Sequence, residues 1–590
     1  MWGYEMMDNK SIATLLYETA DLLEIDAQDS FRIRSYRNAA ESIDGLADQI
    51  TDLACEPKKL LEVPGIGKGM QANLIEICNT GKLQLHEELI GKYRPTMLEL
   101  LKISGLGPKT IQLLWSAFQV ADVDGVERLA KEGKLRELPR MSEKTEQKIL
   151  KSIETYRSIS GRYLLNDADE IALKLIDHIR PFKGVEKITP AGSLRRGRET
   201  VGDLDILITG TACENPSERA ALADHVLKFP GILETLLKGD NKVTFRLRNG
   251  MQVDVRLLPR DSFGAAMQYF TGSKTHNVTL RQRAIRMGYT LNEYGLAQLK
   301  DDGSAGKIVA SKTEEDIYKK LKLAYIPPEM RENCGEIELA EKSEIPELLK
   351  LEDLQGDVHM HTVETDGKCT IEEMATAARD RGYKYMAITD HTKNLAMANG
   401  LTDERALLHI ARIREANKKI DGIKIFAGAE VDILAEGDLD LSDEVLAQMD
   451  IVIASVHSHF NQEPTQMTER ILKAIENPNT CLIGHPTGRL LLRRDAYKLD
   501  MDAILKAAAK HKVAMEHNAY PDRLDLNDQH LRMARQRGVK IVINTDSHHT
   551  SHMQMIKFGV LQARRAWLTK DDVLNTLPAD KFAKAIKHGW

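Results

Sequence analysis

The chain has few cysteines and no stretch that could span a membrane. Its six cysteines among 590 residues are scattered and form no Cys-x-x-Cys pair, so the sequence predicts reduced thiols without a disulfide framework or a zinc finger. No apolar run approaches the ~20 residues that a transmembrane helix needs, and the first residues lack a signal-peptide pattern. We therefore expect a cytoplasmic protein with no membrane partner.

An excess of basic residues is also missing. The formal net charge is -6, so any nucleic-acid binding must come from local basic patches. Histidine is scarce in the front of the chain, because only four of the 18 histidines precede residue 358. The later ones cluster in short strand-like motifs, which favours a metal-binding C-terminal domain.

The pattern of apolar residues changes along the chain and indicates a multidomain α/β and α+β protein. Residues 10–160 show helical spacing, whereas short strands begin near residue 185, and Asn249-Gly250 predicts a tight hairpin between two of them. Beyond a Pro- and Glu-rich stretch, strands alternate with helices. At 590 residues several cores are expected. We expect boundaries at 1–92, 93–158, 159–262, 263–328, a linker at 329–355, and 356–590.

A glycine motif is repeated in the helical region. VPGIGKG (63–69) and ISGLGPK (103–109) each place Gly-x-Gly before a helix, the helix–hairpin–helix pattern. Such glycines let backbone N–H groups at a helix start approach a phosphate. A third copy, at 138–150, has Arg140 and Ser142 in place of the glycines, and we expect it to keep the shape without the contact. The predicted DNA-binding residues are Gly65, Gly67, Lys68, Gly105, Gly107 and Lys109.

Three aspartates form the first candidate catalytic group. Asp203 and Asp205 are two apart in GDLDILIT and therefore share one face of a strand. Asp254 lies in QVDVRLL, on a strand that could bring it beside the pair. Clustered carboxylates repel one another unless cations neutralise them, which is the requirement of two-metal phosphoryl transfer. The sequence therefore predicts a catalytic site for two divalent ions.

These motifs, with GSLRRG (192–197), YFTGSKTHN (269–277) and LNEYGL (291–296), resemble family X DNA polymerases over about residues 10–325. The resemblance implies a nucleotidyltransferase palm at 159–262 and a thumb at 263–328. It also implies that Asp203, Asp205 and Asp254 hold two Mg²⁺ or Mn²⁺ ions. The residues that it implies at the nucleotide are Arg162, Gly192, Ser193, Arg196, Tyr269, Phe270, Gly272, Asn277 and Arg281.

The same resemblance assigns a supporting pair and marks one departure. Arg256 resembles an arginine that pairs with Glu293 in one thumb position and releases Asp254 in the other. Family members with lyase activity use a lysine nine residues beyond the proline of the first hairpin. Counting from Pro64 reaches Asn73, whose amide forms no imine, so we expect little lyase chemistry.

The second candidate group consists of histidines and carboxylates that follow apolar, strand-like runs. In α/β barrels this is the end of the strands where active sites lie. Mixed nitrogen and oxygen ligands without thiolates suit manganese or zinc. The residues are His359, His361, Asp366, His391, Glu430, His457, His485, Asp546 and His548.

The order and spacing of these residues resemble the PHP (polymerase and histidinol phosphatase) domain over about residues 356–575. The resemblance implies a distorted seven-stranded β/α barrel with up to three Mn²⁺ or Zn²⁺ ions. MEHNAYPDRLDL (515–526) resembles a segment that places Asn518 and Arg523 near the substrate. Together the two halves resemble bacterial and archaeal family X polymerases that carry a PHP domain.

We expect a monomeric, nucleoid-associated enzyme that fills short gaps in base excision repair, using gapped or recessed-end DNA and dNTPs. The C-terminal site would act as a 3′–5′ exonuclease or 3′-end phosphoesterase, with AP endonuclease activity a further expectation. Two alternatives stay open: a nucleotidyltransferase that acts on RNA or a small molecule, and a DNA-binding scaffold with inactive sites. Extension and degradation of a labelled primer on gapped DNA would distinguish them.

Overall fold

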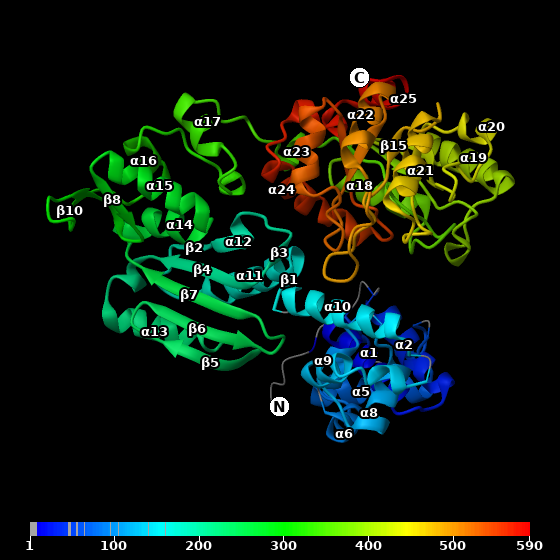
Figure 1. Cartoon of the computed structure of the whole chain (residues 1–590), viewed down its shortest axis with the longest axis horizontal. Helices are drawn as coiled ribbons and strands as arrows, with labels where there is room; N and C mark the ends of the chain where they lie inside the picture. The colour runs from blue at the N-terminus through cyan, green and yellow to red at the C-terminus, as the bar shows by residue number, and fades with distance from the viewer. Residues whose placement is uncertain are drawn as a thin grey trace. The chain divides into compact units, whose positions relative to one another are not determined.

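The structure is a computed structural model that describes every residue except 1–6, 8, 45, 47–48, 55–56, 64, 95, 104, 140 and 160. Pro64 and Arg140 therefore lie outside the described residues. The chain forms two compact units, Met1–Ser160 and Gly161–Trp590 (Figure 1). Within the described part of the chain, no helix combines the length and apolar character needed to cross a membrane.

The first unit is helical, as predicted. Its helices bury apolar residues at three- and four-residue spacing, such as Ile12 and Leu16, in one shared core. They are α1 (Asn9–Ile25), α2 (Ser30–Asp44), α3 (Ile50–Ala54), α4 (Pro57–Leu60), α5 (Lys68–Thr80), α6 (Gln84–Tyr93), α7 (Thr96–Leu100), α8 (Pro108–Phe118), α9 (Val123–Lys131) and α10 (Glu143–Ile159).

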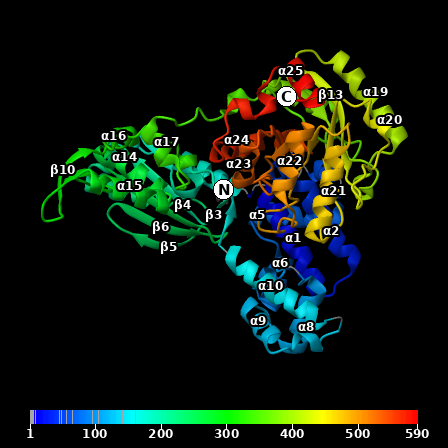
Figure 2. The same ribbon diagram turned by 45° about the horizontal axis from the view of Figure 1, so that its top comes forward.

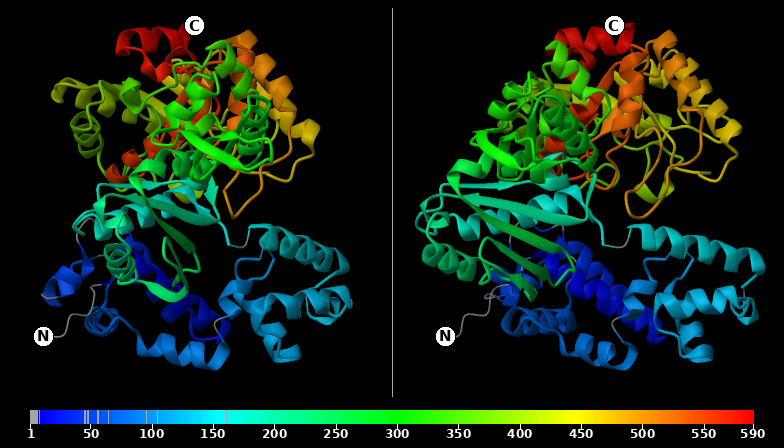
Figure 3. Two further views of the ribbon diagram at one scale, coloured as in Figure 1. Left: turned by 90° about the vertical axis from the view of Figure 1, so that its left-hand side faces the viewer. Right: turned by 60° about the vertical axis from the view of Figure 1, so that its left-hand side comes forward.

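The second unit begins with a five-stranded sheet in the order β2-β4-β7-β6-β5, where β4 and β7 are parallel and the other pairs antiparallel. Helices α11 (Leu165–Ile179) and α13 (Pro216–Val226) cover one face of this sheet (Figure 3). Asn249-Gly250 joins β6 to β7, and Gly250 has φ +89°, which confirms the predicted hairpin. The strands are β2 (Lys187–Pro190), β4 (Asp203–Thr209), β5 (Ile232–Lys238), β6 (Lys242–Leu247) and β7 (Gln252–Leu258).

A small helical and three-stranded region follows. Its core joins α15 and α16 to the sheet β10-β9-β8. The stretch predicted as a linker is packed rather than solvated, because Arg331 and Glu336 in it are fully buried and α17 (Glu336–Lys342) contributes Ile337 to the same core. The elements are α14 (Phe263–Thr271), α15 (Lys274–Arg286), β8 (Tyr289–Asn292), β9 (Gly295–Leu299), β10 (Ala305–Ala310) and α16 (Glu314–Lys320).

The C-terminal region is a nearly closed barrel of seven parallel strands in sequential order, as predicted. Every strand residue except Lys424 is buried, because helices cover the strands from outside, α19, α21 and α22 among them (Figure 2). The strands are β11 (Gly356–Asp357), β12 (Tyr385–Ile388), β13 (Lys424–Asp432), β14 (Ile451–Ser455), β15 (Leu482–Ile483), β16 (Ala514–Asn518) and β17 (Ile541–Asn544). The helices are α18 (Ile371–Asp380), α19 (Asp403–Lys419), α20 (Asp443–Leu446), α21 (Pro464–Glu476), α22 (Met501–His511), α23 (Asp528–Gln536), α24 (Ile556–Arg565) and α25 (Ala579–His588).

Candidate metal centres and DNA-binding hairpins

The three palm aspartates lie together at one end of the parallel pair β4 and β7. Asp205 is directly opposite Asp254 in the register, and Asp203 lies two residues earlier on the same face of β4. Burial, then the negative charges of Asp203 and Asp254, raises the pKa of Asp205 to about 7. A divalent cation would relieve this repulsion, so the carboxylates fit a metal site.

Sequence reasoning missed a lysine at this site. Lys242 begins β6 and places its Nζ 2.8 Å from Asp254 Oδ2, while the Thr244 hydroxyl donates to Oδ1 of the same aspartate over 2.7 Å. Strand β6 pairs with β7, so residues 242, 244 and 254 share one face. The only signal in the sequence was the alternation Lys242-Val243-Thr244 on the preceding strand. It points to Asp254 only once the pairing register of β6 and β7 is known.

Two of the residues predicted at the nucleotide, Gly192 and Arg162, lie near the aspartates. Gly192 has φ +58°, and a Cβ there would lie 2.5 Å from Asp205 Oδ2, so only glycine fits. Arg162 donates to the Thr200 hydroxyl over 2.7 Å and to the Thr200 carbonyl over 2.6 Å. Ser193 lies between Gly192 and Leu194 in the short helix α12 (Gly192–Arg195).

Five further residues predicted at the nucleotide meet at the end of α14. Tyr269 and Phe270 pack edge to face with ring centroids 5.0 Å apart, and Gly272 follows with φ +69°. Asn277 donates to the Tyr269 carbonyl over 2.8 Å, and the Arg281 guanidinium lies 5.1 Å from the Tyr269 ring centroid. The structure thus brings these predicted residues together.

Two predicted arginines already have partners in the protein. Arg196 donates to Glu332 over 3.0 Å and to the carbonyl of Thr271. Arg256 lies over the Phe270 ring, 3.8 Å from its centroid, and within the described residues it forms no ion pair with Glu293 or Asp254. The role assigned to Arg256 and Glu293 therefore stays a prediction.

The predicted histidine and carboxylate ligands converge at the carboxyl ends of the barrel strands. His359 and His361 follow β11 rather than lying on a strand, because β11 ends at Asp357. Three overlapping groups could each hold an ion, and all the predicted ligands except His485 belong to them. The groups are His361, Asp366, His391 and His548; His359, His361, Glu430 and Asp546; and His391, Glu430 and His457.

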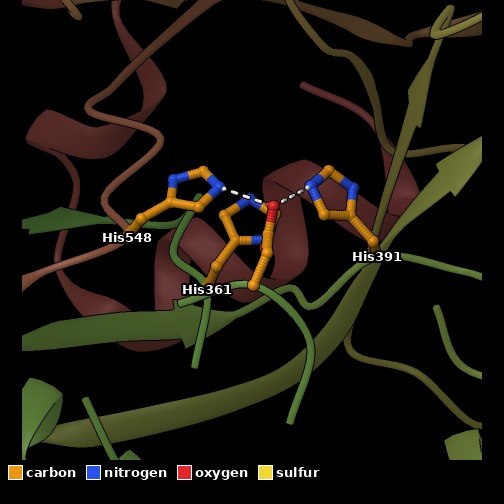
Figure 4. A group of neighbouring side chains, drawn as sticks. His361, His391 and His548 are labelled. Atoms are coloured by element: carbon orange, nitrogen blue, oxygen red, sulfur yellow. Dashed lines mark ion pairs between the residues drawn. The ribbon is translucent and has the colours of Figure 1, made fainter. Parts of the chain in front are cut away.

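The first of these groups is centred on a single carboxylate oxygen. Asp366 Oδ2 lies 3.4 Å from His391 Nε2 and 3.3 Å from His548 Nε2. Figure 4 shows the rings of His361, His391 and His548 gathered on the same side of the strands. His485, outside the groups, bonds Glu430 Oε1 through Nε2 at 2.8 Å.

Buried atoms without hydrogen bonds indicate that this cluster fits metal ions. His359 Nε2, His361 Nε2 and Asp546 Oδ1 are buried and make no hydrogen bond of acceptable geometry, although the last two lie only 3.1 Å apart. Burial would raise the pKa of Glu430, but the imidazoles of His457 and His359 outweigh it and hold that pKa well below its usual range. Buried nitrogen and oxygen atoms that make no hydrogen bond can serve as ligands to divalent ions.

Sequence reasoning also missed the residues that orient the ligands. Glu516 is fully buried on β16 and its Oε1 lies 2.6 Å from His359 Nδ1, while Asp432 bonds His457 Nδ1. Such carboxylates fix the ring orientation of a ligating histidine. Asn518 donates to Asp546 Oδ2 over 3.1 Å, and Arg523 Nε lies 3.6 Å from the same oxygen, so both predicted substrate-side residues reach the cluster.

The hairpins of the first unit share one turn. In the first copy the N–H of Ile66 donates to the Val63 carbonyl, and in the second the N–H of Leu106 donates to the Ile103 carbonyl. The third copy has the same bond, from the N–H of Met141 to the Leu138 carbonyl, and so keeps the shape as expected. Gly65 and Gly105 have φ of +82° and +98°. Lys68 and Lys109 are exposed. A Cβ on Gly67 or Gly107 would meet nothing within 4 Å, so the chain itself does not require glycine there.

Comparisons with known proteins agree with both halves. The helix-hairpin-helix domain matches residues 7–83, the SAM-like helix-hairpin-helix tandem 97–155, the DNA polymerase beta thumb 266–332 and the PHP domain 357–520. The DNA polymerase/3′-5′ exonuclease PolX of Bacillus subtilis (strain 168) is 37% identical over 571 residues, covering 96% of this chain and 97% of that protein. The chain belongs to the PolX family.

Other relatives of this PolX family chain match only about a third of it. A probable phosphatase of Thermoanaerobacter sp. (strain X514) is 30% identical over 232 residues, covering 37% of this chain and 89% of that protein. A probable phosphatase of Caldicellulosiruptor saccharolyticus is 31% identical over 204 residues, covering 33% of this chain and 80% of that protein.

Proposed function

We propose that this chain fills short gaps in DNA by template-directed addition of dNTPs, and that its barrel removes nucleotides from 3′ ends. The observation that carries the proposal is the presence of two separate acidic or histidine-rich centres in one compact unit, together with glycine hairpins suited to phosphates. Gapped or recessed-end DNA would be the substrate of both centres. Base excision repair, a monomeric state and a cytoplasmic, nucleoid-associated location follow as proposals.

In the polymerase half, Asp203, Asp205 and Asp254 would hold two Mg²⁺ or Mn²⁺ ions. When bound, these ions would activate the primer 3′-hydroxyl and neutralise the triphosphate. Gly192, Ser193 and Arg162 would bind the triphosphate beside them, with Arg196 exchanging Glu332 for a phosphate oxygen.

The turn at the end of α14 would select the sugar. Tyr269, Phe270 and Gly272 would lie beneath the deoxyribose and leave no room for a 2′-hydroxyl. Asn277 and Arg281, which contact Tyr269, would reach the minor-groove side of the new base pair. Poor use of ribonucleotides is the corresponding expectation.

In the barrel, the histidine and carboxylate ligands would hold up to three Mn²⁺ or Zn²⁺ ions, which would supply an activated water. Asn518 and Arg523 would orient the phosphodiester beside Asp546. Cleavage at abasic sites by the same centre is part of this proposal.

Lyase activity is not part of the proposal. Asn73 donates its amide N–H to the Tyr36 hydroxyl over 2.7 Å, so the position carries a structural hydrogen bond and no amine. The exposed Lys68 would be a weak substitute.

Both alternatives are less well supported. A DNA-binding scaffold has no need for the unpaired buried atoms of His359, His361 and Asp546. An enzyme acting on a small molecule has no need for paired phosphate-binding hairpins, and one acting on RNA has no need for a turn at Tyr269 and Phe270 that leaves no room for a 2′-hydroxyl.

Reciprocal substitutions in the full chain test the proposal. Asp254→Ala should reduce primer extension more than about a hundredfold, or roughly 3 kcal/mol of barrier, while 3′ degradation persists. The double change His359→Ala and His361→Ala should remove bound ions and 3′ degradation while extension persists. Loss of both activities in either variant, or of neither, contradicts the assignment of two centres.

A further inference from the structure

The loop that follows Gly192 in the palm also touches the barrel. Arg565 on α24 donates to the Arg196 carbonyl over 2.9 Å, and Gln562 donates to the carbonyl of Gly197. Gly197 has φ +64°, and a Cβ there would lie 3.2 Å from Leu561 Cβ. The contact is therefore close-packed, and palm and barrel belong to the same compact unit.

A partly buried ion pair extends this contact toward the barrel centre. Glu199 Oε2 accepts from Arg489 Nη2 over 2.8 Å, and only 11% of the Arg489 side chain is exposed. The same guanidinium donates from Nε to the Arg523 carbonyl over 2.9 Å and from Nη2 to the Leu524 carbonyl. One arginine fork thus ties a palm carboxylate to two consecutive carbonyls of the barrel.

Those two carbonyls belong to a segment whose backbone needs support. Leu524 has φ +40°, a region that leucine rarely adopts, and its side chain is fully buried in the palm core beside Phe558. The neighbouring Arg523 points the other way, with Nε 3.6 Å from Asp546 Oδ2. Contacts with the palm therefore hold the backbone from which Arg523 reaches the metal-ligand cluster.

We propose that Glu199, a palm residue, is a positioning residue for the barrel's phosphoesterase site. Through Arg489 it holds residues 523–524 and so aims Arg523 at the scissile phosphate. The inference rests on the proposed function of the barrel. The palm residue Glu199 would then support the second active site without contacting the nucleotide of the first.

The alternative is that Glu199 only helps to dock the palm on the barrel. The chain offers a matched control for this, because Asp169 on α11 pairs with Lys557 over 2.6 Å across the same two regions. Among the described residues, neither Asp169 nor Lys557 forms a hydrogen bond or an ion pair with residues 522–526. Asp169→Asn therefore removes a docking ion pair and leaves the Arg489 fork in place.

The test uses the full chain with Mn²⁺ and a 5′-labelled single-stranded oligodeoxynucleotide, and follows 3′ degradation. Glu199→Gln should lower kcat/KM by roughly tenfold, the scale seen when a supporting hydrogen bond is lost. Bound metal, thermal stability and primer extension should stay near wild type, as should degradation by Asp169→Asn. In an Arg523→Ala background, adding Glu199→Gln should cause no further loss.

Several results would overturn the inference. If the activity losses of Glu199→Gln and Arg523→Ala multiply in the double variant, the two residues act separately. If Asp169→Asn loses as much activity as Glu199→Gln, Glu199 only helps to dock the palm on the barrel. Full activity of Arg523→Ala would remove the reason to position it. If Glu199→Gln fails to fold, Arg489→Lys replaces it in the test, because lysine keeps the charge but cannot reach both carbonyls. Unchanged 3′ degradation by Arg489→Lys then refutes the inference. Failure of the proposed function would appear differently, as no degradation by the wild type.

Discussion

At the scale of single residues, the palm site balances charge before any ion binds. Asp254 is neutralised by Lys242 at 2.8 Å, while Asp205, beside Asp203 and Asp254, has its pKa raised to about 7 by burial and by their charges. A cation that binds Asp254 has to share or displace the oxygen that Lys242 contacts. The lysine therefore sets how strongly the site attracts its ions.

Lys242→Met should lower the Mg²⁺ concentration needed for half-maximal primer extension. Removing one positive charge at this distance changes the interaction by at least about 1 kcal/mol, or roughly fivefold in affinity. Titrating Mg²⁺ in an extension assay measures the shift. Lys238→Met is the control, because Lys238 pairs with Asp224 on helix α13 instead. An unchanged or higher Mg²⁺ requirement in Lys242→Met contradicts the competition.

At the scale of elements, the hairpins have glycine at two positions where neither packing nor backbone conformation requires it. Gly67 and Gly107 are the N-caps of α5 and α8, with φ of −91° and −84° that any residue can adopt. The first turns of both helices carry no acidic residue. Open space in front of a helix N-terminus suits a phosphate.

Gly67→Val and Gly107→Val should each weaken binding to gapped DNA because the side chain would occupy the space of a phosphate. Folding should be almost unaffected, since losing a glycine N-cap costs at most about 1 kcal/mol. Fluorescence anisotropy at several salt concentrations, with thermal melts alongside, measures both. Gly91→Val is the matched control, because its Cβ also meets nothing but lies within α6. Equal affinity for gapped DNA in all three variants would show that the hairpins do not contact DNA.

A second element-scale feature is the buried ion cluster that joins palm to thumb. Glu314 on α16 accepts from Arg195 over 2.6 Å and from the fully buried Arg331 over 2.5 Å. Burial alone would raise the pKa of Glu314, but Arg331 and Arg195 outweigh it and lower the pKa to about 2. The stabilisation is therefore complete above the unfolded value of about 4.5 and is lost as pH falls toward 2.

Glu314→Ala should destabilise the second unit by about 3–5 kcal/mol at pH 7, because Arg331 would keep a buried charge without its partner. The difference from wild type should shrink as pH falls from about 4.5 toward 2. Urea denaturation at pH 7, 4 and 3 measures it. Glu315→Ala, at an exposed neighbouring position, should have no such effect. A pH-independent difference would exclude the ion cluster as its cause.

At the scale of the whole molecule, residues 161–590 form one compact unit, and the predicted linker contributes buried residues such as Arg331 and Glu336 to it. Leu524 and Phe558 of the barrel pack in the palm core, and Arg565 bridges Glu332 and Asp528. A barrel cut off near residue 356 would expose these groups to water. The palm, thumb and barrel are therefore expected to depend on one another for stability.

A fragment of residues 161–590 should fold, retain metal-dependent extension and degradation, and melt more cooperatively than a fragment of residues 356–590. Without the hairpins it should bind DNA more weakly, with a shallower dependence on salt, because fewer phosphates are contacted. Calorimetry and salt titrations of both fragments and the full chain measure this. A barrel fragment as stable as residues 161–590 would contradict the dependence.

Much of this protein could be predicted from the order of its residues. The aspartate alternation in β4, the Asn249-Gly250 turn, the paired hairpins and the strand-end histidines are local patterns, and local patterns report strand faces, turns and barrel ends directly. Lys242, Glu516 and Arg489 were not predictable in this way. Each acts on a residue distant in sequence or on a neighbouring strand, so its role depends on pairing register and packing. Sequence alone determined which ligands the two centres offer. Only the tertiary structure decided which side chains hold those ligands in place, and that palm and barrel share one supporting contact. The reason is that charge and backbone support act between residues that are close in space but distant in sequence.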